Sequence, residues 1–171
     1  MLGQIPIFTI FNEKISLVVK FMFSNIKRVR ESYELTQREM AKILKISKSS
    51  YNYFETGEYI IPLKHLNNFC NIFHVSMDYI CGLTDKNIKV KNKYSLNKKD
   101  IGNKLKEIRK NSNLTQKEIA KIINTSQSNI STYENGNTLI LTAFLYNYAK
   151  HFNVSMDYIC GRNNNIKIKT F

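Results

Sequence analysis

The feature that most constrains this chain is an internal repeat whose two copies stand 79 residues apart. Aligned without a gap, residues 26–82 and 105–161 are identical at 25 of 57 positions, and the run Val-Ser-Met-Asp-Tyr-Ile-Cys-Gly ends both copies unchanged. A constant spacing over this length indicates one folded module that is present twice in a chain of 171 residues. We call 26–82 repeat one and 105–161 repeat two. A module of about 60 residues is large enough to fold around a small core of its own.

Each repeat carries the start signals of several helices. Its apolar residues recur at helical spacing, and no stretch alternates as a strand would. A threonine followed three residues later by a glutamate, at Thr36 and Thr115, predicts a helix that begins with a capping box. Serines suited to cap the next helix stand at Ser47 and Ser126. The other expected helices lie near 101–111, 62–73 and 141–152, with short fifth helices that open at Ser76 and Ser155.

The predicted fold class is therefore all-α, with two tandem five-helix domains joined by a basic linker. The linker is expected to be a solvated coil, because it holds six lysines in seventeen residues and few apolar ones. Residues 1–21 have no counterpart before repeat two, and we expect a short strand or an amphipathic helix there. The predicted boundaries are 1–21 for this N-terminal appendage, 22–83 for the first domain, 84–100 for the linker, 101–162 for the second domain and 163–171 for a basic tail.

The charge of the chain favours a polyanionic partner. There are 26 Lys and Arg against 13 Asp and Glu, which gives a formal net charge of +13. The excess is uneven, since residues 1–87 hold 11 basic and 8 acidic residues (+3) and residues 88–171 hold 15 and 5 (+10). Nucleic acid and an acidic membrane surface are the polyanions that such a chain would bind. The alternative is a soluble protein that is rich in Lys and Asn for other reasons.

The residue pattern favours a cytoplasmic protein without a metal or a membrane span. Cys70, Cys81 and Cys160 lack metal-ligand spacing and stand in apolar helical contexts, which predicts reduced core thiols. Charged residues interrupt the apolar stretch of 1–21 too early for a membrane span, and no basic segment precedes it as in a signal peptide. Paired carboxylates, nucleophile motifs and phosphate-binding loops are missing as well. We therefore expect no enzymatic activity, no cofactor and no membrane partner.

The third helix of each repeat is polar where a buried helix would be apolar. A capped helix with an interior alanine (Ala41 or Ala120), a tight turn and a serine-capped polar helix form the pattern of a helix-turn-helix. Two interpretations of the polar face stay open: an ordinary solvated face, or donors and acceptors that read base edges in the major groove. The polar residues are Lys48, Ser49, Ser50, Asn52 and Tyr53 in repeat one, and Gln127, Ser128, Asn129, Ser131 and Thr132 in repeat two.

Both repeats resemble the Cro and phage-repressor helix-turn-helix family, also called XRE-type, in the runs LTQREMAKILKISKSSYNYFETG and LTQKEIAKIINTSQSNISTYENG. The run VSMDYICG that follows each of them resembles the fifth helix of that family. The resemblance covers 24–83 and 103–162. It implies the compact five-helix, lambda-repressor-like fold and sequence-specific binding to double-stranded DNA, usually by transcriptional repressors.

The resemblance also implies roles for single residues. The helix-two glutamine of the family, which typically bonds a phosphate and braces the recognition helix, falls on Gln37 and Gln116. The groove-facing positions of the family fall on Lys48, Ser49, Tyr53, Gln127, Ser128 and Thr132. A buried ion pair of the family matches Arg30 with Glu55 and Arg109 with Glu134, and we interpret these pairs as structural.

Repeat one departs from the family pattern more than repeat two. The glycine usual in the turn is replaced by Lys45 in repeat one and by Asn124 in repeat two, and only asparagine tolerates the left-handed region well. Tyr53 places a bulky ring at a base-facing position, as a base or sugar contact or as cover for the core. Repeat two keeps Gln127, whose amide can bond adenine with two hydrogen bonds. We therefore expect repeat two to be the stronger reader of DNA.

Several arrangements and one rival function follow from the sequence. The two repeats would cover adjacent, non-identical half-sites as a pseudo-dimer, with the linker lysines adding phosphate contacts and a steep dependence on salt. Alternatively, one repeat binds DNA and the other forms a homodimer through its fifth helix. The candidate contacts are then Met77, Tyr79, Met156 and Tyr158, for which core packing is the plainer explanation. The rival function is an antitoxin or regulatory adaptor that binds a toxin or another protein.

Overall fold

A computed structural model describes residues 24–87, 89 and 92–167 of the chain. The appendage predicted at 1–21 and the last residues of the predicted tail lie outside this part. Within it the regular structure is helical, apart from one isolated antiparallel bridge between Val154 and Lys167. The fold class is all-α with two helical modules in tandem, as the repeat predicts.

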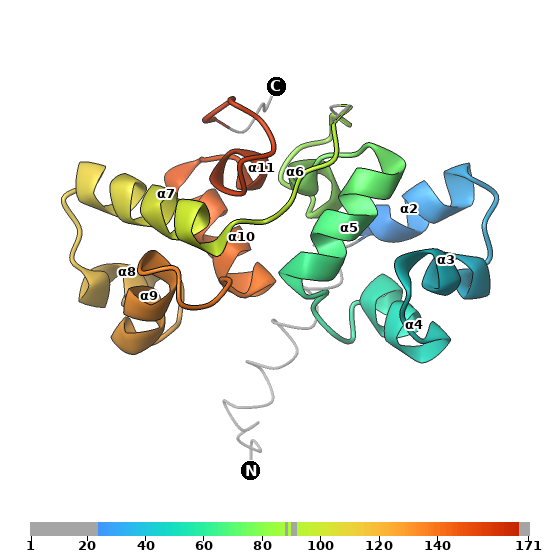
Figure 1. The fold of residues 1–171 in the computed structure, drawn as a ribbon, viewed down its shortest axis with the longest axis horizontal. Helices are drawn as coiled ribbons and strands as arrows, with labels where there is room; N and C mark the ends of the chain where they lie inside the picture. The colour runs from blue at the N-terminus through green and yellow to red at the C-terminus, as the bar shows by residue number, and fades with distance from the viewer. Residues whose placement is uncertain (1–23, 88, 90–91, 168–171) are drawn as a thin grey trace, which may run out of the picture. The chain divides into compact units, whose positions relative to one another are not determined.

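Each repeat forms five helices (Figure 1). Those of repeat two begin with α7, which starts three residues before the predicted 101 because Asn97 caps it and accepts hydrogen bonds from the backbone N–H of Lys99 and Asp100. The helices are α2 (Ser24–Ser32), α3 (Gln37–Leu44), α4 (Lys48–Thr56), α5 (Leu63–Phe73), α6 (Met77–Ile80), α7 (Lys98–Asn111), α8 (Gln116–Ile122), α9 (Gln127–Glu134), α10 (Thr142–Phe152) and α11 (Met156–Ile159).

The chain divides into two compact units whose border does not follow the repeats. Of the described residues, the first unit holds 24–60 and 80–82, and thus α2, α3 and α4. The second unit holds 61–79 and the described residues from 83 to 167. Helix α5 and most of α6 therefore share a unit with the whole of repeat two, although their sequence belongs to repeat one.

The predicted helix starts are present in both units. Thr36 and Glu39 form a capping box in which the backbone N–H of Thr36 donates to the Glu39 carboxylate at 2.8 Å, and the same bond in repeat two measures 2.7 Å. Ser47 accepts from the backbone N–H of Ser50 at 3.0 Å and caps α4. Ser126 caps α9 in the same way. These local bonds set where the second and third helices of each repeat begin.

The turn between the second and third helices is left-handed in both repeats. Lys45 has φ 57° and Asn124 has φ 60°, at the position where the resembled family carries glycine. Two further pairs of non-glycine residues at the 79-residue spacing share this conformation. They are Glu34 with Asn113 and His74 with Asn153. Repeat two thus has asparagine at all three of these non-glycine positions, and repeat one has none.

The two modules pack around small apolar cores. Ala41 and Ala120 are buried where α3 lies against α4 and α8 lies against α9, which the small alanine side chain permits (Figure 1). Apolar residues of α5 that include Leu66 and Phe69 are buried as well. Cys70, Cys81 and Cys160 are free thiols and buried, as predicted. Among the described residues, no helix is long and apolar enough to cross a membrane, and no group of His, Cys, Asp or Glu is placed to hold a metal ion.

Candidate nucleic-acid interface

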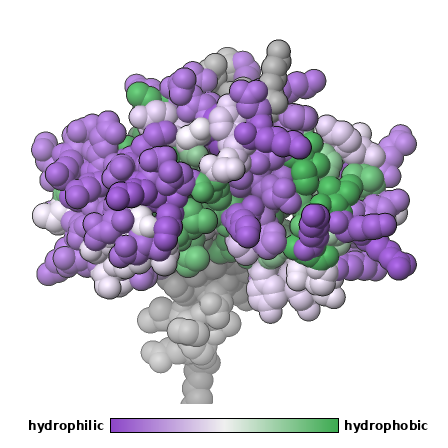
Figure 2. All heavy atoms as spheres, in the orientation of Figure 1, coloured by the Kyte–Doolittle hydropathy of each residue, from purple (hydrophilic) through white to green (hydrophobic). Residues whose placement is uncertain are grey.

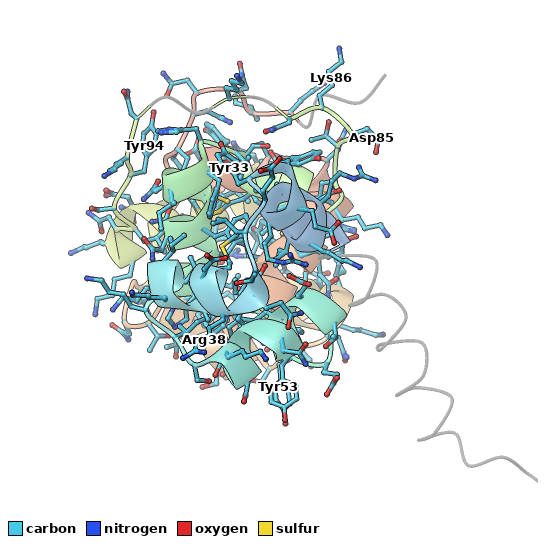
Figure 3. All side chains as sticks on the ribbon, turned by 90° about the vertical axis from the view of Figure 1, so that its right-hand side faces the viewer. Tyr33, Arg38, Tyr53, Asp85, Lys86 and Tyr94 are labelled. Carbon is cyan, nitrogen blue, oxygen red and sulfur yellow. The ribbon has the colours of Figure 1, made fainter. Side chains whose placement is uncertain are left out.

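Helix α4 presents its polar residues on the side opposite its buried residues. Tyr51 and Phe54 are buried and face the core of the first unit. Lys48 and Ser49 are exposed at the start of the helix, while Ser50, Asn52 and Tyr53 are half-buried along it. Tyr53 points away from the body of the unit (Figure 3).

Helix α9 has the same division of faces with different polar chemistry. Ile130 and Tyr133 are buried, and the first turn of the helix is exposed. The exposed residues of that turn are Gln127, Ser128 and Asn129, and the half-buried residues that follow are Ser131 and Thr132. Amide and hydroxyl groups predominate on this face, and such groups can both donate hydrogen bonds to base edges and accept from them.

The third helix of the first unit is held by a charged network. Arg30 on α2 donates from Nε to Glu55 Oε2 at 2.8 Å and from Nη2 to Glu55 Oε1 at 2.9 Å. Its Nη1 donates to the carbonyl of Leu35 at 2.7 Å. Gln37 at the start of α3 donates from Nε2 to Glu55 at 3.1 Å and to Asn52 at 3.2 Å. The network joins α2, α3 and α4, so it fixes the position of α4 relative to the other two helices.

The second unit repeats this network in a more buried form. Arg109 donates from Nε to Glu134 Oε1 at 2.5 Å and from Nη2 to Oε2 at 2.8 Å, and Gln116 Nε2 donates to Oε2 at 2.9 Å. The backbones of α7 and α9 approach closely at Gly102. A Cβ at this position would stand 2.4 Å from the carbonyl oxygen of Tyr133, so the approach requires glycine. Burial raises the pKa of Glu134, but the hydrogen bonds from Arg109 and Gln116 with the Arg109 charge hold that pKa below its usual value.

One aromatic residue near the polar face of α4 was not selected from the sequence. Tyr59 follows α4 and is 60% exposed, and its ring meets the Tyr53 ring edge-on with centroids 4.8 Å apart. Its backbone N–H donates to the carbonyl of Tyr53 at 3.1 Å. Repeat two has Thr132 and Thr138 at these positions. Comparison of the two repeats beyond the third helix would have found this difference.

Basic residues contribute to the surface of the second unit. Figure 2 shows hydrophilic side chains over the visible face of this unit around α7. This helix, whose sequence is KKDIGNKLKEIRKN, carries five lysines and one arginine against two acidic residues. Lysines on such a face can neutralise phosphates without regard to base sequence. The positive excess of residues 88–171 is therefore partly carried by one described helix.

The fifth helices cap each other inside the second unit. The Asp78 carboxylate accepts from the backbone N–H of Met156 at 2.7 Å and from the Ser155 hydroxyl. Asp157 in turn accepts from the backbone N–H of Asp78 at 3.1 Å. Met156 and Met77 are completely buried, so the predicted fifth-helix contacts are used within the chain. Reciprocal bonding between corresponding residues is the pattern of a two-fold contact.

Part of the predicted linker is also held. The backbone N–H of Tyr94 donates to Asn71 Oδ1 at 3.1 Å, and its carbonyl accepts from Asn67 and Asn71 at 2.8 Å each. The Arg162 guanidinium lies over the Tyr94 ring, 5.5 Å from its centroid. The expectation of a solvated coil is therefore wrong at Tyr94, because the side-chain amides on α5 match its backbone groups.

Both repeats match known protein families. Residues 26–80 match a family described as "Helix-turn-helix" and residues 102–164 match one described as "Helix-turn-helix domain". No significant match to a solved structure was found.

Among curated proteins, the chain is similar to the uncharacterized HTH-type transcriptional regulator YobD of Bacillus subtilis, with 37% identity over 60 residues, 35% of this chain and 54% of that protein. It is 43% identical over 60 residues to the competence pilus inhibition repressor of Acinetobacter baylyi, again 35% of this chain and 54% of that protein. It is 38% identical over 63 residues to the antitoxin PezA of Streptococcus pneumoniae, 37% of this chain and 40% of that protein. The chain thus spans about half the length of the first two of these relatives, and less of the third.

Proposed function

Because the chain consists largely of two tandem helix-turn-helix domains homologous to those of XRE-type transcriptional regulators, we propose that it is a cytoplasmic, sequence-specific repressor that reads double-stranded DNA with α4, α9 or both. The observation that carries this proposal is the polar face of α9, which is exposed and stands on the Arg109–Glu134–Gln116 network. A face that must match base edges benefits from such a support, because its side chains are positioned before DNA arrives.

The proposed reading residues differ in chemistry between the repeats. Gln127 supplies an amide that suits adenine, whereas Lys48 supplies a cation that suits guanine or a phosphate. Gln116 donates one amide hydrogen to the glutamate of the ion pair, and its second hydrogen is the group proposed to reach a phosphate. Gln37 donates to both Glu55 and Asn52, so its proposed phosphate contact would replace the bond to Asn52. The proposal therefore assigns base reading to the third helices and backbone positioning to the two glutamines.

We further propose that the two reading helices act as an unlike pair within one chain. The reciprocal caps of Asp78 and Asp157 favour this arrangement over a homodimer through the fifth helix, because Met77 and Met156 are already buried within the chain. The operator would then be an imperfect repeat, with one half-site for each third helix.

Selection of bound sequences from a random DNA pool tests the proposal. Gln127→Ala should lower affinity for the selected site by about 1–3 kcal/mol and relax the preference at one base pair, because a bidentate contact is lost. Lys48→Ala tests the first repeat in the same way. Lys110→Ala on the basic helix α7 is the control for sequence reading, because loss of a phosphate contact should leave the preference at every base pair unchanged. A pool that shows no sequence enrichment for the wild-type protein would refute sequence-specific reading.

A second candidate is an antitoxin or regulatory adaptor, favoured by the likeness to the antitoxin PezA. In that case one helix-turn-helix domain mainly binds another protein, such as a toxin. Purification of the tagged full chain from its own host distinguishes the two functions. A stoichiometric protein partner, together with no retardation of DNA at physiological salt, would favour the adaptor.

A further inference from the structure

A single buried arginine joins the end of repeat two to α5 inside the second unit. Arg162 is 1% exposed. Its Nε donates to Asp157 Oδ1 at 2.9 Å, and its Nη1 donates to the amide oxygens of Asn67 at 2.6 Å and Asn71 at 2.7 Å. Its Nη2 donates to the carbonyl of Val75 at 3.4 Å. The guanidinium therefore bonds one residue of repeat two and three residues of repeat one.

Both asparagines use the oxygen and the nitrogen of their side-chain amides within this cluster. Asn71 Oδ1 accepts from both Arg162 and the backbone N–H of Tyr94. Asn67 Oδ1 accepts from Arg162, and the amide nitrogens of both asparagines donate to the Tyr94 carbonyl. A buried polar group that loses its hydrogen-bond partner destabilises the structure. The cluster is therefore most stable when Arg162 supplies the donors to the asparagine oxygens.

The cluster has no counterpart at the 79-residue spacing. The residue of repeat one that corresponds to Arg162 is Leu83. The residues of repeat two that correspond to Asn67 and Asn71 are Tyr146 and Lys150. The reciprocal caps of the fifth helices are thus nearly symmetric, while the arginine cluster exists on one side only.

This asymmetry penalises the pairing of like repeats. If two copies of repeat two met through the same surface, each Arg162 would lose both asparagine oxygens and would face the ammonium group of Lys150. If two copies of repeat one met, Leu83 would leave the asparagine oxygens without a donor, and two Asp78 carboxylates would meet without a cation. Unpaired buried polar groups and facing like charges reject a wrong partner more strongly than good contacts select the right one.

We propose that Arg162, Asn67 and Asn71 form a pairing-specificity site that directs repeat two to the α5–α6 segment of repeat one and rejects a second repeat two. The partner that this surface fits is repeat one of the same chain. One consequence rests on the proposed function: a chain paired in this way presents α4 and α9 as two different readers, and a homodimer through the fifth helix is not required.

The test is to cut the folded full chain and ask which fragments stay together. A protease recognition sequence inserted after the exposed residue Asn87 is cleaved in the purified protein, and the products are followed by native mass spectrometry and by dilution. The expected product is a one-to-one complex of the N-terminal and C-terminal fragments. Homodimers of either fragment, or immediate separation of the two, would overturn the proposal.

Two variants assign the effect to the site. Arg162→Leu gives repeat two the residue of repeat one, and Asn71→Lys gives repeat one the residue of repeat two. Each should raise the dissociation constant of the cut complex at least about tenfold. Lys110→Leu removes one positive charge from an exposed position on α7 and should leave the constant unchanged.

The double variant separates recognition from simple loss of folding. If Arg162 interacts directly with the residue at position 71, Asn71→Lys raises the dissociation constant by a smaller factor in the R162L background than in the wild type. Equal effects in the two backgrounds would show that the two positions are independent and would contradict the proposal. The measurement uses no DNA, so a failure of DNA binding by the intact protein would count against the proposed function and leave the pairing result unaffected.

Discussion

Three non-glycine residues in each repeat adopt the left-handed backbone conformation, and the two repeats fill these positions with different residues. Repeat two has Asn113, Asn124 and Asn153 there. Asparagine tolerates positive φ because its short side chain can bond the local backbone. The corresponding residues of repeat one, Glu34, Lys45 and His74, lack this advantage. Repeat one thus has the same turns at a higher cost in backbone strain.

The strain at Lys45 predicts a stabilising substitution. Lys45→Asn should raise the free energy of unfolding by about 0.5–1 kcal/mol, because φ 57° is retained with a residue that adopts it more readily. The measurement is chemical denaturation of the two proteins side by side. The reverse change, Asn124→Lys, should lower stability by a similar amount. If both changes shifted stability in the same direction, the turn conformation would not be the cause.

At the scale of the helices, the polar face of each third helix depends on an ion pair on the buried side of that helix. Arg30 and Arg109 each link the first helix of a repeat to the end of the third, and Gln37 and Gln116 add the second helix. The sequence pattern indicated these pairs through the family resemblance. It did not indicate that each glutamine bonds the glutamate of the pair, because the bond depends on how the second and third helices cross.

The burial of this pair makes its carboxylate essential for stability. Glu134→Ala should lower the free energy of unfolding by about 3–5 kcal/mol, because the buried Arg109 guanidinium loses both carboxylate oxygens. Thermal or urea denaturation checks this, with the exposed Glu107→Ala on α7 as the control, for which a change below about 0.5 kcal/mol is expected. A loss as small as that of the control would mean that the pair is solvated in solution.

The polar residues of the third helices were identifiable from the sequence, because helical spacing separates them from the apolar residues that face the core. Tyr59 was not identified, because it stands outside a helix, where periodicity carries no information. Its contact with Tyr53 depends on the turn that follows Gly57. Sequence patterns therefore located the candidate face, and the structure added the neighbour that changes its shape.

At the scale of the whole molecule, the second unit contains a buried acidic pair with one cation. Burial and the nearby Asp157 charge raise the pKa of Asp78 to about 7, although the Ser155 hydroxyl and the Met156 N–H oppose this shift. Arg162 bonds Asp157 directly, and the surrounding thiols Cys70 and Cys160 are held neutral because burial raises their pKa values. Burial raises the pKa of Asp157 as well, but the Arg162 charge and its hydrogen bond oppose that shift, so the proton of the pair is expected on Asp78.

This arrangement predicts stability that falls as pH rises. Below about pH 4 the Asp78 carboxyl is protonated in the folded and unfolded states alike. Between about pH 4 and 7 the unfolded chain releases this proton and the folded chain keeps it, so folding becomes less favourable until the pH exceeds 7. Between pH 5 and 8 the loss should be on the order of 2 kcal/mol. Asp78→Asn, which keeps an acceptor for Met156, should abolish most of it.

Urea denaturation of the wild type and of Asp78→Asn at pH 5 and pH 8 checks the prediction. The carboxylates of Glu55 and Glu134 have pKa values held below their usual range, so they contribute stability that is lost only at lower pH. Their titration lies outside this window. Parallel pH profiles for the two proteins would show that Asp78 is ionised in the folded state and would contradict the assignment.

The sequence by itself determined the two modules, the helix starts and the position of the polar faces. Each of these follows from residues close together in the chain, from a three-residue capping box to an ion pair 25 residues apart. Only the tertiary structure decided that α5 and most of α6 belong with repeat two, and that Arg162 completes this unit. Those contacts join residues 77 to 95 positions apart, and neither helical spacing nor a capping pattern extends over such a distance. The burial of the partners in a common core selects them, and burial is a property of the folded chain.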